Sequence, residues 1–193
     1  MARAGLTAAV VTGIALEVLD RAGPAGLTLK AVAQQAGVAP PSLYKHVQGL
    51  DELQSLMVVA VLDECADRLG ASVMGLAGED ALRAFLAEYR AYARDYPHRH
   101  TLVEQAGASG GHGPAAERAA RRTVEVAYAV VRGYGFGEDD MVHAVRALRA
   151  VVSGFVSLEL AAGYQMPTRI DDSFAFVVDL LADGLAARAR GTA

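Results

Sequence analysis

The stretch AGVAPPSLYKHV, residues 36 to 47, places four side chains suited to binding nucleic acid directly after two adjacent prolines. Ser42 and Tyr44 carry hydroxyl groups, Lys45 carries an ammonium group and His46 carries an imidazole. Side chains of these types reach the phosphates and base edges of DNA. Each residue alone would fit an ordinary surface position equally well. The four together, at this spacing, predict contact with DNA.

The two prolines indicate where the helix that carries these residues begins. Proline at the first helical position loses no hydrogen bond, because the N–H that it lacks would be unpaired there. Pro40 and Pro41 therefore predict a helix that begins at one of them and runs to about Val47. Leu43 and Val47 lie four residues apart on one face of that helix, so we expect both to point inward.

The preceding residues predict two more short helices. Residues 10 to 19 repeat apolar side chains at helical spacing, and DRAGPAGLT, residues 20 to 28, then interrupts the pattern with a Gly-Pro-Gly break. Thr28 is placed as the N-cap of the helix LKAVAQQA, and Gly37 as the left-handed residue that ends it. Three short helices with a glycine-centred turn between the second and third form a helix-turn-helix arrangement.

The rest of the chain continues with helical periodicity, and no segment shows the alternation typical of a strand. Six further helices are expected after residue 50, so the sequence predicts an all-α fold of about nine helices. We expect a helix-turn-helix DNA-binding domain over residues 1–50 and a larger helical body over residues 51–193. No flexible linker is expected between the two.

Charge is distributed unevenly between these two segments. The first fifty residues carry a net charge of +2 and the remainder carries −6, which together give the −4 of the whole chain. Both lysines of the protein, Lys30 and Lys45, lie in the first fifty residues. A basic segment on an acidic body predicts an anionic partner at the N-terminal end only.

Cysteine use and hydropathy limit where the protein is expected to work. Cys65 is the only cysteine, so it has no partner for an internal disulfide or a Cys-x-x-Cys site, and a cytoplasmic location is expected. No run reaches the roughly 18 uncharged apolar residues that a membrane span requires. We therefore expect no membrane partner.

Motifs for other kinds of chemistry are missing from the sequence. It contains no pair of carboxylates at catalytic spacing, no G-x-S-x-G motif and no phosphate-binding loop, so we expect neither an enzyme nor a cofactor. His98 and His100 lie two residues apart at a helix start and should point in different directions. Because a metal needs converging ligands, we also expect no metal site.

Over about Leu27 to Leu53, as LTLKAVAQQAGVAPPSLYKHVQGLDEL, the chain resembles the TetR family of bacterial transcriptional regulators. The resemblance includes the threonine at position 28, the Ala-Gly-Val turn at 36 to 38 and the Leu-Tyr-x-His pattern at 43 to 46. VVSGFVSLELAAGY and DDSFAFVVDLLADGL also look like the last two helices of one TetR subgroup. The resemblance implies a head of three helices that binds a double-stranded DNA operator, a body that binds a small-molecule effector, and a homodimer formed through the last two helices.

Carried over residue by residue, the resemblance assigns DNA contacts within the head. The residues that would meet backbone phosphates are Thr28, Lys30, Ser42, Tyr44 and His46. The residues that would face base edges in the major groove are Pro40, Pro41 and Lys45. One position departs from the family, because Leu50 stands where members commonly have a lysine that contacts a phosphate. This departure predicts lower affinity for DNA or a shallower salt dependence.

In the body, the resemblance implies an effector pocket between the central helices. The residues expected to line it are Met57, Phe85, Tyr89, His100, Tyr128 and Phe155. Ordinary core packing is the alternative for each of them. The residues expected at the dimer interface are Val152, Val156, Glu159, Phe174, Val178 and Leu181. Glu159 is expected either to pair with an arginine across the interface, which we favour, or to line the pocket.

The sequence thus predicts a homodimeric transcriptional regulator, a repressor that a small-molecule effector releases from its operator. One alternative is a ligand-binding helical protein whose head has lost specific DNA recognition, and Leu50 is the feature that supports it. A small-molecule enzyme is the other alternative, and no sequence motif favours it.

Overall fold

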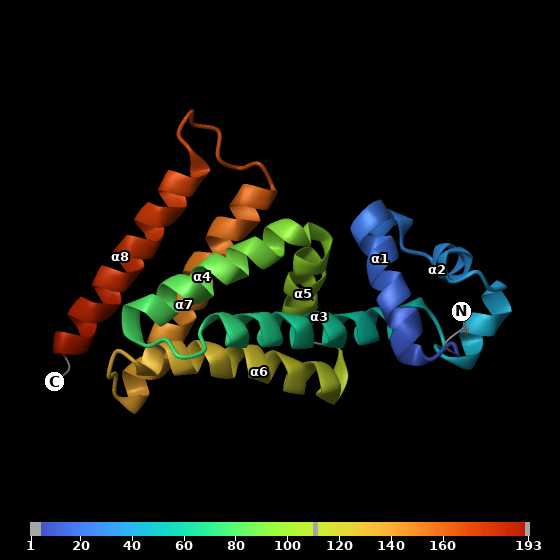
Figure 1. Cartoon of the computed structure of the whole chain (residues 1–193), viewed down its shortest axis with the longest axis horizontal. Helices are drawn as coiled ribbons and strands as arrows, with labels where there is room; N and C mark the ends of the chain where they lie inside the picture. The colour runs from blue at the N-terminus through green and yellow to red at the C-terminus, as the bar shows by residue number, and fades with distance from the viewer. Residues whose placement is uncertain (1–4, 110–111, 192–193) are drawn as a thin grey trace. The chain divides into compact units, whose positions relative to one another are not determined.

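The computed structural model describes residues 5–109 and 112–191, with the backbone alone over residues 106–109. Within these ranges the chain forms eight α-helices and one 3₁₀ helix, without any strand (Figure 1). The elements in chain order are α1 (Ala8–Gly26), α2 (Leu29–Ala36), η1 (Pro40–Lys45), α3 (Leu50–Ser72), α4 (Gly78–Asp95), α5 (Pro97–Ser109), α6 (Gly113–Arg132), α7 (Glu138–Leu160) and α8 (Ile170–Gly191). The expected all-α fold of about nine helices is confirmed.

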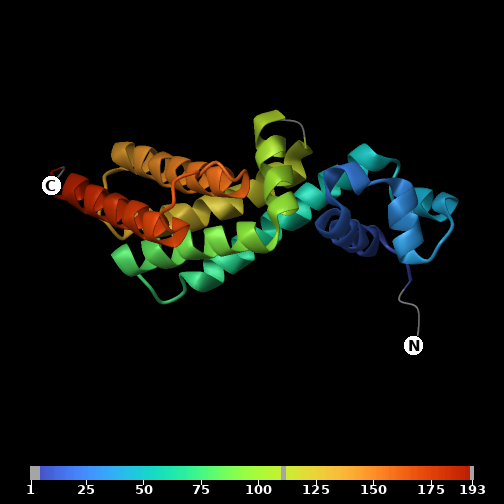
Figure 2. The same cartoon turned by 90° about the horizontal axis from the view of Figure 1, so that it is seen from above.

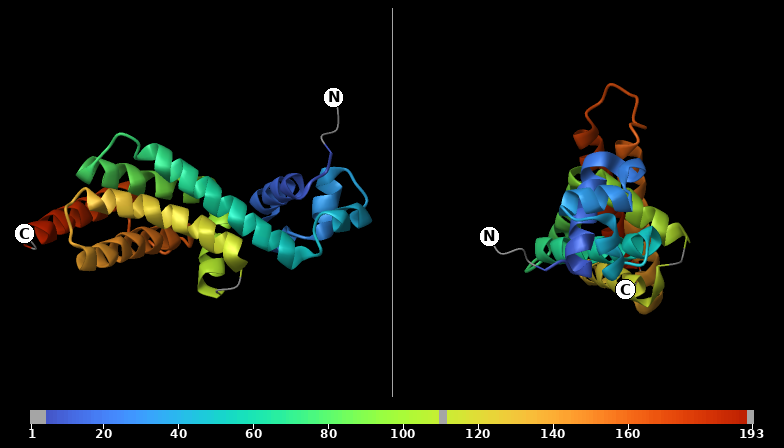
Figure 3. Two further views of the ribbon diagram at one scale, coloured as in Figure 1. Left: turned by 90° about the horizontal axis from the view of Figure 1, so that it is seen from below. Right: turned by 90° about the vertical axis from the view of Figure 1, so that its right-hand side faces the viewer.

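The chain folds into two compact units. The first unit comprises Met1–Glu64 and Tyr96–Ala120, and the second comprises Cys65–Asp95 and Arg121–Ala193, so the division falls within α3 and within α6. In the first unit, α1, α2 and η1 gather into one group, which we call the N-terminal group (Figure 2). In the second unit, α7 packs against α4 and α8 (Figure 3). A functional boundary at residue 50 stays a prediction.

Helix α1 is longer than its sequence pattern predicts. The expected break lies at Gly23, which has φ 68° and ψ −179° inside the helix, and the chain then resumes a helical turn through Pro24 to Gly26. A positive φ is accessible to glycine without strain, and proline is tolerated in the first turn of the resumed helix. The break is therefore a kink within α1 instead of its end.

The ends of α2 are formed as the sequence predicts. The Thr28 hydroxyl accepts a hydrogen bond from the N–H of Ala31 at 3.1 Å, which makes it the N-cap. Gly37 adopts the left-handed conformation, with φ 67° and ψ 32°, and its N–H donates to carbonyls at the end of α2. Both positions are confirmed, and together they fix the turn that leads into η1.

Apolar side chains from α4, α7 and α8 form most of the core of the second unit. Among the buried residues of this core are Leu82, Phe85 and Leu86 of α4, Leu148, Val152 and Val156 of α7, and Phe174 and Val178 of α8. Their three- and four-residue spacing gives each helix one apolar face, and burying these faces against each other stabilises the unit.

Helix α7 is the one described helix that is long and apolar enough to cross a membrane by length and composition. Its Leu148, Val152 and Val156 side chains are buried in the core of the second unit. A core helix passes the same test of length and composition, so α7 by itself is a weak indication of a membrane span.

Candidate nucleic-acid interface

The segment that carries the predicted DNA contacts is η1, a 3₁₀ helix of six residues in place of the expected α-helix to about Val47. Its backbone N–H groups bond three residues back, from Ser42 to the carbonyl of Ala39 at 2.9 Å and from His46 to the carbonyl of Leu43 at 2.8 Å. The two prolines at its start have no N–H to donate, and the element is too short to establish a longer ladder of α-helical bonds.

The tighter helix changes which side chains lie beside each other. In a 3₁₀ helix, residues three apart eclipse, so Pro41 lies next to Tyr44 and Ser42 next to Lys45. Pro41, Tyr44 and Lys45 are exposed, with Tyr44 exposed over 59% of its surface, whereas Ser42 is half-buried. The outer face of η1 thus presents two short rows, one of proline and phenol and the other of hydroxyl and ammonium.

The inner face of η1 is anchored in the N-terminal group. Leu43 and Val47 are buried, with 0% and 1% exposure, as are Val32 and Ala33 of α2. The expectation that Leu43 and Val47 point inward is confirmed. Because these side chains fix the rotation of η1 about its axis, they determine which of its residues face solvent.

The predicted contact residues lie together on the start of α2 and on η1. Those that are exposed are Thr28, Lys30, Pro40, Pro41, Tyr44 and Lys45, and those that are half-buried are Ser42 and His46. Their contacts with a duplex stay predictions. The surface they form can offer hydroxyl and ammonium groups to phosphates and apolar and cationic groups to base edges.

A hydrogen-bonded link between α1 and α2 supports this surface. Arg21 donates from Nη1 to Oε1 of Gln35 at 3.0 Å, and Gln35 donates from Nε2 to Oε2 of Glu17 at 3.3 Å. Sequence reasoning did not identify this link, because fourteen and eighteen residues separate the partners. The link holds α2 against α1 on the solvent side of the N-terminal group.

Leu50 is the first residue of α3 and is half-buried. Beside it, Asp51 and Glu52 occupy the first turn, and the Glu52 carboxylate accepts a hydrogen bond from the backbone N–H of Gln48. The side chain of Leu50 cannot provide the phosphate contact that a lysine would provide at this position.

The six residues expected to line an effector pocket are all buried or half-buried. Met57 and His100 belong to the first unit, and the second unit contains Phe85, Tyr89, Tyr128 and Phe155. Tyr89 and Ser153 share a hydrogen bond between their hydroxyl groups at 3.0 Å, which links α4 to α7. Ser153 was not among the expected residues, and its distance in sequence from Tyr89 explains why.

His100 is a buried histidine in α5, with 7% exposure. Burial lowers the pKa of His100 below its usual 6.5, while the negative charge of the nearby Glu104 opposes that shift. At neutral pH the imidazole is therefore neutral in the folded protein.

This burial predicts how the stability of the protein depends on pH. As the pH falls below 6.5, the His100 imidazole of the unfolded chain takes up a proton before that of the folded chain, so the free energy of unfolding should fall. Urea unfolding at several pH values between about 7.5 and 5.5 measures this slope. The slope should diminish in His100→Asn and persist in the control His46→Asn, and an equal slope in all three proteins would contradict the assignment.

A buried ion pair joins α4 to α7. Arg90 donates from Nε and Nη2 to the two carboxylate oxygens of Glu159, each at 2.7 Å, and the two side chains are only 10% and 12% exposed. Glu159 was expected to pair with an arginine across a dimer interface, but the structure provides Arg90 of the same chain. Sequence spacing could not show this partner, because 69 residues separate the pair.

The same guanidinium also contacts α8 and two aromatic rings. Arg90 Nη2 lies 2.8 Å from the Asp171 carboxylate, and the guanidinium carbon lies 4.6 Å from the ring centre of Phe174 and 5.8 Å from that of Phe155. The hydrogen bond with Glu159 raises the pKa of Arg90, and the hydrogen bond with Arg90 lowers the pKa of Asp171. Arg90 therefore ties together three helices of the second unit.

The last two helices expose a row of large apolar side chains. Leu158 of α7 and Phe176 and Leu180 of α8 are 51%, 69% and 63% exposed. Four of the residues expected at a dimer interface point instead into the core of their own unit, namely Val152, Val156, Phe174 and Val178, while Leu181 is half-buried. Phe176 and Leu180 are four residues apart, as are the buried Phe174 and Val178, so spacing alone did not show which pair is exposed.

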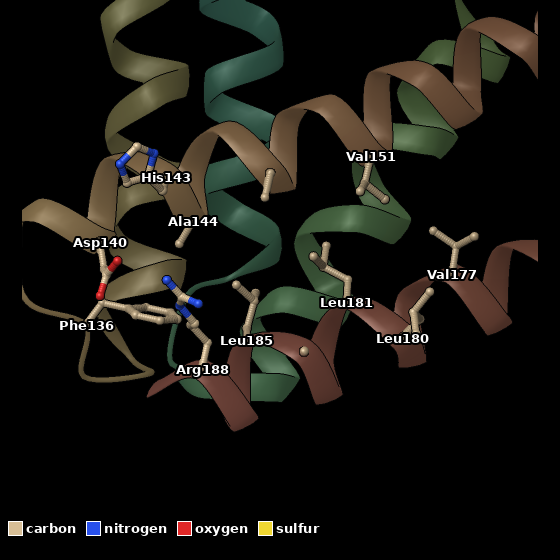
Figure 4. Close-up of a pocket in the computed structure, with 12 residues that line it drawn as sticks. Phe136, Asp140, His143, Ala144, Val151, Val177, Leu180, Leu181, Leu185 and Arg188 are labelled. Atoms are coloured by element: carbon tan, nitrogen blue, oxygen red, sulfur yellow. The ribbon is translucent and has the colours of Figure 1, made fainter. Parts of the chain in front are cut away.

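A groove of about 430 Å³ lies between α7 and α8 in the second unit (Figure 4). Val151, Val177 and Leu180 lie toward one end, and Asp140 and Arg188 lie toward the other. Gly184 also lines the groove, and a Cβ built on it would have no neighbouring atom within 4 Å. The groove offers an apolar floor, with open space, to a partner surface.

The two histidines near the start of α5, His98 and His100, have different surroundings. The His98 ring lies 3.4 Å from the place where a Cβ on Gly23 would be, whereas His100 is buried. Across the described ranges, no group of three or more His, Cys, Asp or Glu residues is arranged to hold a metal ion.

Two family models match the sequence. The model described as bacterial regulatory proteins, tetR family, matches residues 14–53, which include α2 and η1. The model described as tetracyclin repressor-like, C-terminal domain, matches residues 82–181. The HTH-type transcriptional regulator Rv0681 of Mycobacterium tuberculosis, which is named as uncharacterized, is 33% identical over 90% of this chain and 79% of its own length.

Solved structures share the fold over nearly the whole chain. A TetR variant from Acinetobacter baumannii AYE, in complex with minocycline, is 26% identical with a TM-score of 0.70, over 95% of this chain and 98% of that one. BioQ of Mycobacterium smegmatis is 24% identical with a TM-score of 0.68, over 94% and 98% of the two chains. A BioQ structure that contains its natural double-stranded DNA operator has a TM-score of 0.65 at 24% identity, over 94% and 99% of the chains.

Proposed function

The chain belongs to the TetR family of bacterial transcriptional regulators, and from this premise we propose that it is a repressor that leaves its operator when a small-molecule effector binds. The observation that carries the proposal is the exposed polar face of η1, held in place by the buried Leu43 and Val47. We place the protein in the cytoplasm, where DNA and effector are both accessible. This family consists of transcriptional regulators, which are not enzymes.

The proposed mechanism is geometric. In a homodimer, two copies of η1 enter successive major grooves of a near-palindromic operator, about one helical turn apart. Residues 1–50 act as the DNA-binding domain and residues 51–193 as the effector-binding and dimerisation domain. The effector binds more tightly to a conformation in which the separation of the two η1 segments does not match the operator. Effector binding therefore shifts the protein toward that conformation and lowers its affinity for DNA.

The effector would bind among the inward-facing side chains of the body. Within the second unit, Phe85, Tyr128 and Phe155 supply apolar surface, and the Tyr89 hydroxyl supplies a polar group. The other two expected residues, Met57 and His100, belong to the first unit and stay predictions. Support comes from the hydrogen bond between Tyr89 and Ser153, since two hydroxyl groups on facing helices can exchange their mutual bond for bonds to a ligand. A mainly apolar molecule with a few hydrogen-bonding groups would suit such residues.

A second copy of the chain is the proposed partner of the exposed face on α7 and α8. Phe176 and Leu180 lie one turn apart on α8, and both are large apolar side chains that are more than 60% exposed, which favours a partner surface over solvent. Leu158 of α7 is also exposed, over 51% of its surface. The groove between the two helices and the space at Gly184 allow helices of a second copy to approach closely. We therefore propose an interface built from these residues and Leu181, in place of the four that are buried in the protomer.

A binding titration tests the proposed DNA function. The purified protein should shift a duplex from the region upstream of its own gene at concentrations that leave a random duplex of equal length unshifted, at moderate salt. Because non-specific binding depends on phosphate contacts alone, the two duplexes must be compared at the same salt concentration. Equal affinity for both would contradict a specific operator in this region and would favour the alternative of a ligand-binding protein with degenerate DNA recognition.

Two substitutions in η1 are expected to separate base reading from phosphate contact. Lys45→Ala should change the preference among operator variants, because a lysine at a base edge discriminates by about 1 to 3 kcal/mol. Tyr44→Phe should weaken binding to all sequences about fivefold, because it removes one hydrogen bond to the backbone. Fluorescence anisotropy with a panel of operators measures both effects.

The matched control for these variants is Arg132→Ala, which removes an exposed positive charge at the end of α6. It should bind every duplex as the parent does. If Lys45→Ala and Tyr44→Phe also bind like the parent, the assignment of contacts on η1 is incorrect.

A further inference from the structure

The first turn of α5 holds α1 and α3 through one arginine. Arg99 donates from Nε to Oδ1 of Asp20 at 3.0 Å and from Nη2 to Oδ2 of the same carboxylate at 2.6 Å. Its Nη1 donates to Oε2 of Glu64 at 2.7 Å. One guanidinium thus joins Asp20 on α1 to Glu64 on α3, and all three residues lie within the first unit.

The environment of Arg99 makes this junction specific to arginine. Its side chain is only 12% exposed, and its guanidinium carbon lies 4.1 Å from the ring centre of Tyr96, the residue before α5. A planar guanidinium can bond two carboxylates from different sides while its face stacks on an aromatic ring. A lysine ammonium offers a single point of charge and no flat face, so it cannot reproduce the arrangement.

A second contact, between His98 of α5 and Gly23, packs α5 against the kink of α1. The ring atoms Cε1 and Nε2 of His98 each lie 3.4 Å from the position that a Cβ on Gly23 would occupy. Gly23 is also the residue with positive φ at which α1 bends. The bend at Gly23 and the ion pairs of Arg99 together fix the position of α1 against the first turn of α5.

Asp20 and Arg99 lie in parts of the chain that match two different family models. Asp20 lies within residues 14–53, which match the model of bacterial regulatory proteins, tetR family, whereas Arg99 lies within residues 82–181, which match the C-terminal model. Glu17, one turn before Asp20 on α1, and Arg21, the residue after it, bond to Gln35 of α2. Neighbouring positions of α1 therefore bond on one side to α5 and on the other to α2 of the N-terminal group.

We infer that Arg99 is the positioning residue that fixes the N-terminal group to α3 and α5, and that in the dimer it sets the separation of the two η1 segments. The inference rests on the proposed function, because separation matters only to a protein that reads two half-sites at once. A dimer whose two groups are held at the right separation binds the second half-site as an intramolecular event. Loosening the groups lowers that advantage without altering the residues that touch DNA.

The test compares duplexes with the parent and with Arg99→Gln. We expect the variant to bind the two-half-site operator about tenfold more weakly and to bind a single half-site as the parent does. We also expect it to tolerate one base pair inserted between the half-sites better than the parent, because its N-terminal groups are less tightly held. Arg99→Lys should behave like Arg99→Gln, since charge alone cannot rebuild the junction. The control Arg122→Gln, which breaks an exposed pair with Asp67, should match the parent throughout.

Two results would overturn the inference. One is an Arg99→Gln variant that discriminates between operator spacings as the parent does. The other is an equal loss of affinity for single and paired half-sites, which would show damage to the DNA-reading surface itself.

A measurement without DNA separates this inference from the proposed function. Spin labels at Gln34→Cys, an exposed position on α2, in a Cys65→Ala background report the distance between the two N-terminal groups of the dimer. Arg99→Gln should broaden the distribution of distances, and an unchanged distribution would overturn the inference. If the parent shows no preference for any operator while the broadening is present, the proposed function fails and the positioning role of Arg99 stands.

Discussion

A Leu180→Glu variant is expected to be monomeric and to lose at least about a hundredfold in affinity for the operator. Leu180 is 63% exposed on α8 and lines the groove between α7 and α8, so the new carboxylate would be tolerated in the free protomer. In the proposed dimer the same carboxylate would be buried among apolar side chains without a partner, which is strongly unfavourable. A monomer binds only one half-site, so the loss of DNA affinity follows from the loss of the dimer.

Sedimentation equilibrium measures the oligomeric state, and circular dichroism verifies that the helices remain folded. The matched control is Met74→Glu, because Met74 is also a large apolar residue, is 80% exposed, follows α3 and does not line the groove between α7 and α8. Met74→Glu should remain a dimer. A dimeric Leu180→Glu protein would contradict the proposed interface.

Removing the carboxylate of Glu159 is expected to lower the free energy of unfolding by about 2 to 3 kcal/mol. Truncating one partner of a buried ion pair costs about 3 to 5 kcal/mol, because the other charge is left unpaired. The effect should be smaller here, because Arg90 would keep its contact with the more exposed Asp171. Urea unfolding of Glu159→Leu at fixed protein concentration measures the loss, and fixed concentration is needed because dimer formation itself stabilises the fold.

The double variant Arg90→Met with Glu159→Leu distinguishes the cost of an unpaired buried charge from the cost of lost packing. It should recover most of the stability, since replacing both members of a buried pair by apolar residues of similar size is often close to neutral. The control Arg83→Gln removes an arginine from exposed pairs with Glu79 and Asp179 and should cost less than about 1 kcal/mol. Equal losses in Glu159→Leu and Arg83→Gln would show that burial of the Arg90 pair adds nothing.

The sequence alone was sufficient to predict the helices and the residue types on the surface of the N-terminal group. Helical periodicity predicts the all-α fold, and local chemistry predicts Thr28 as an N-cap, Gly37 as a left-handed residue and Leu43 as a buried anchor. Each of these features depends on residues a few positions apart, so a linear reading contains the necessary information. The 3₁₀ form of η1 was missed, although the two prolines at its start were the available signal. The break at Gly23 was predicted, but the helical turn that follows it was not.

The partners of charged side chains were decided by the tertiary structure. Glu159 meets Arg90 of the same chain, and Asp20 meets Arg99 across 79 residues. A carboxylate in a sequence has many possible arginine partners, and only the packing of helices brings one of them within hydrogen-bonding distance.

For the last two helices, too, the sequence predicted the elements, but only the tertiary structure decided which of their faces are buried. The resemblance implied that the last two helices form a dimer interface, but both faces of α8 carry apolar residues. Only the packed structure shows that Phe174 and Val178 turn inward while Phe176 and Leu180 remain outside. The sequence by itself therefore determined the elements, their caps and the chemistry of the η1 surface, because short-range backbone and side-chain preferences act within a single helix. Which side chains form ion pairs, which are buried and which face a partner depended on how the helices pack, because those contacts join residues far apart in the chain.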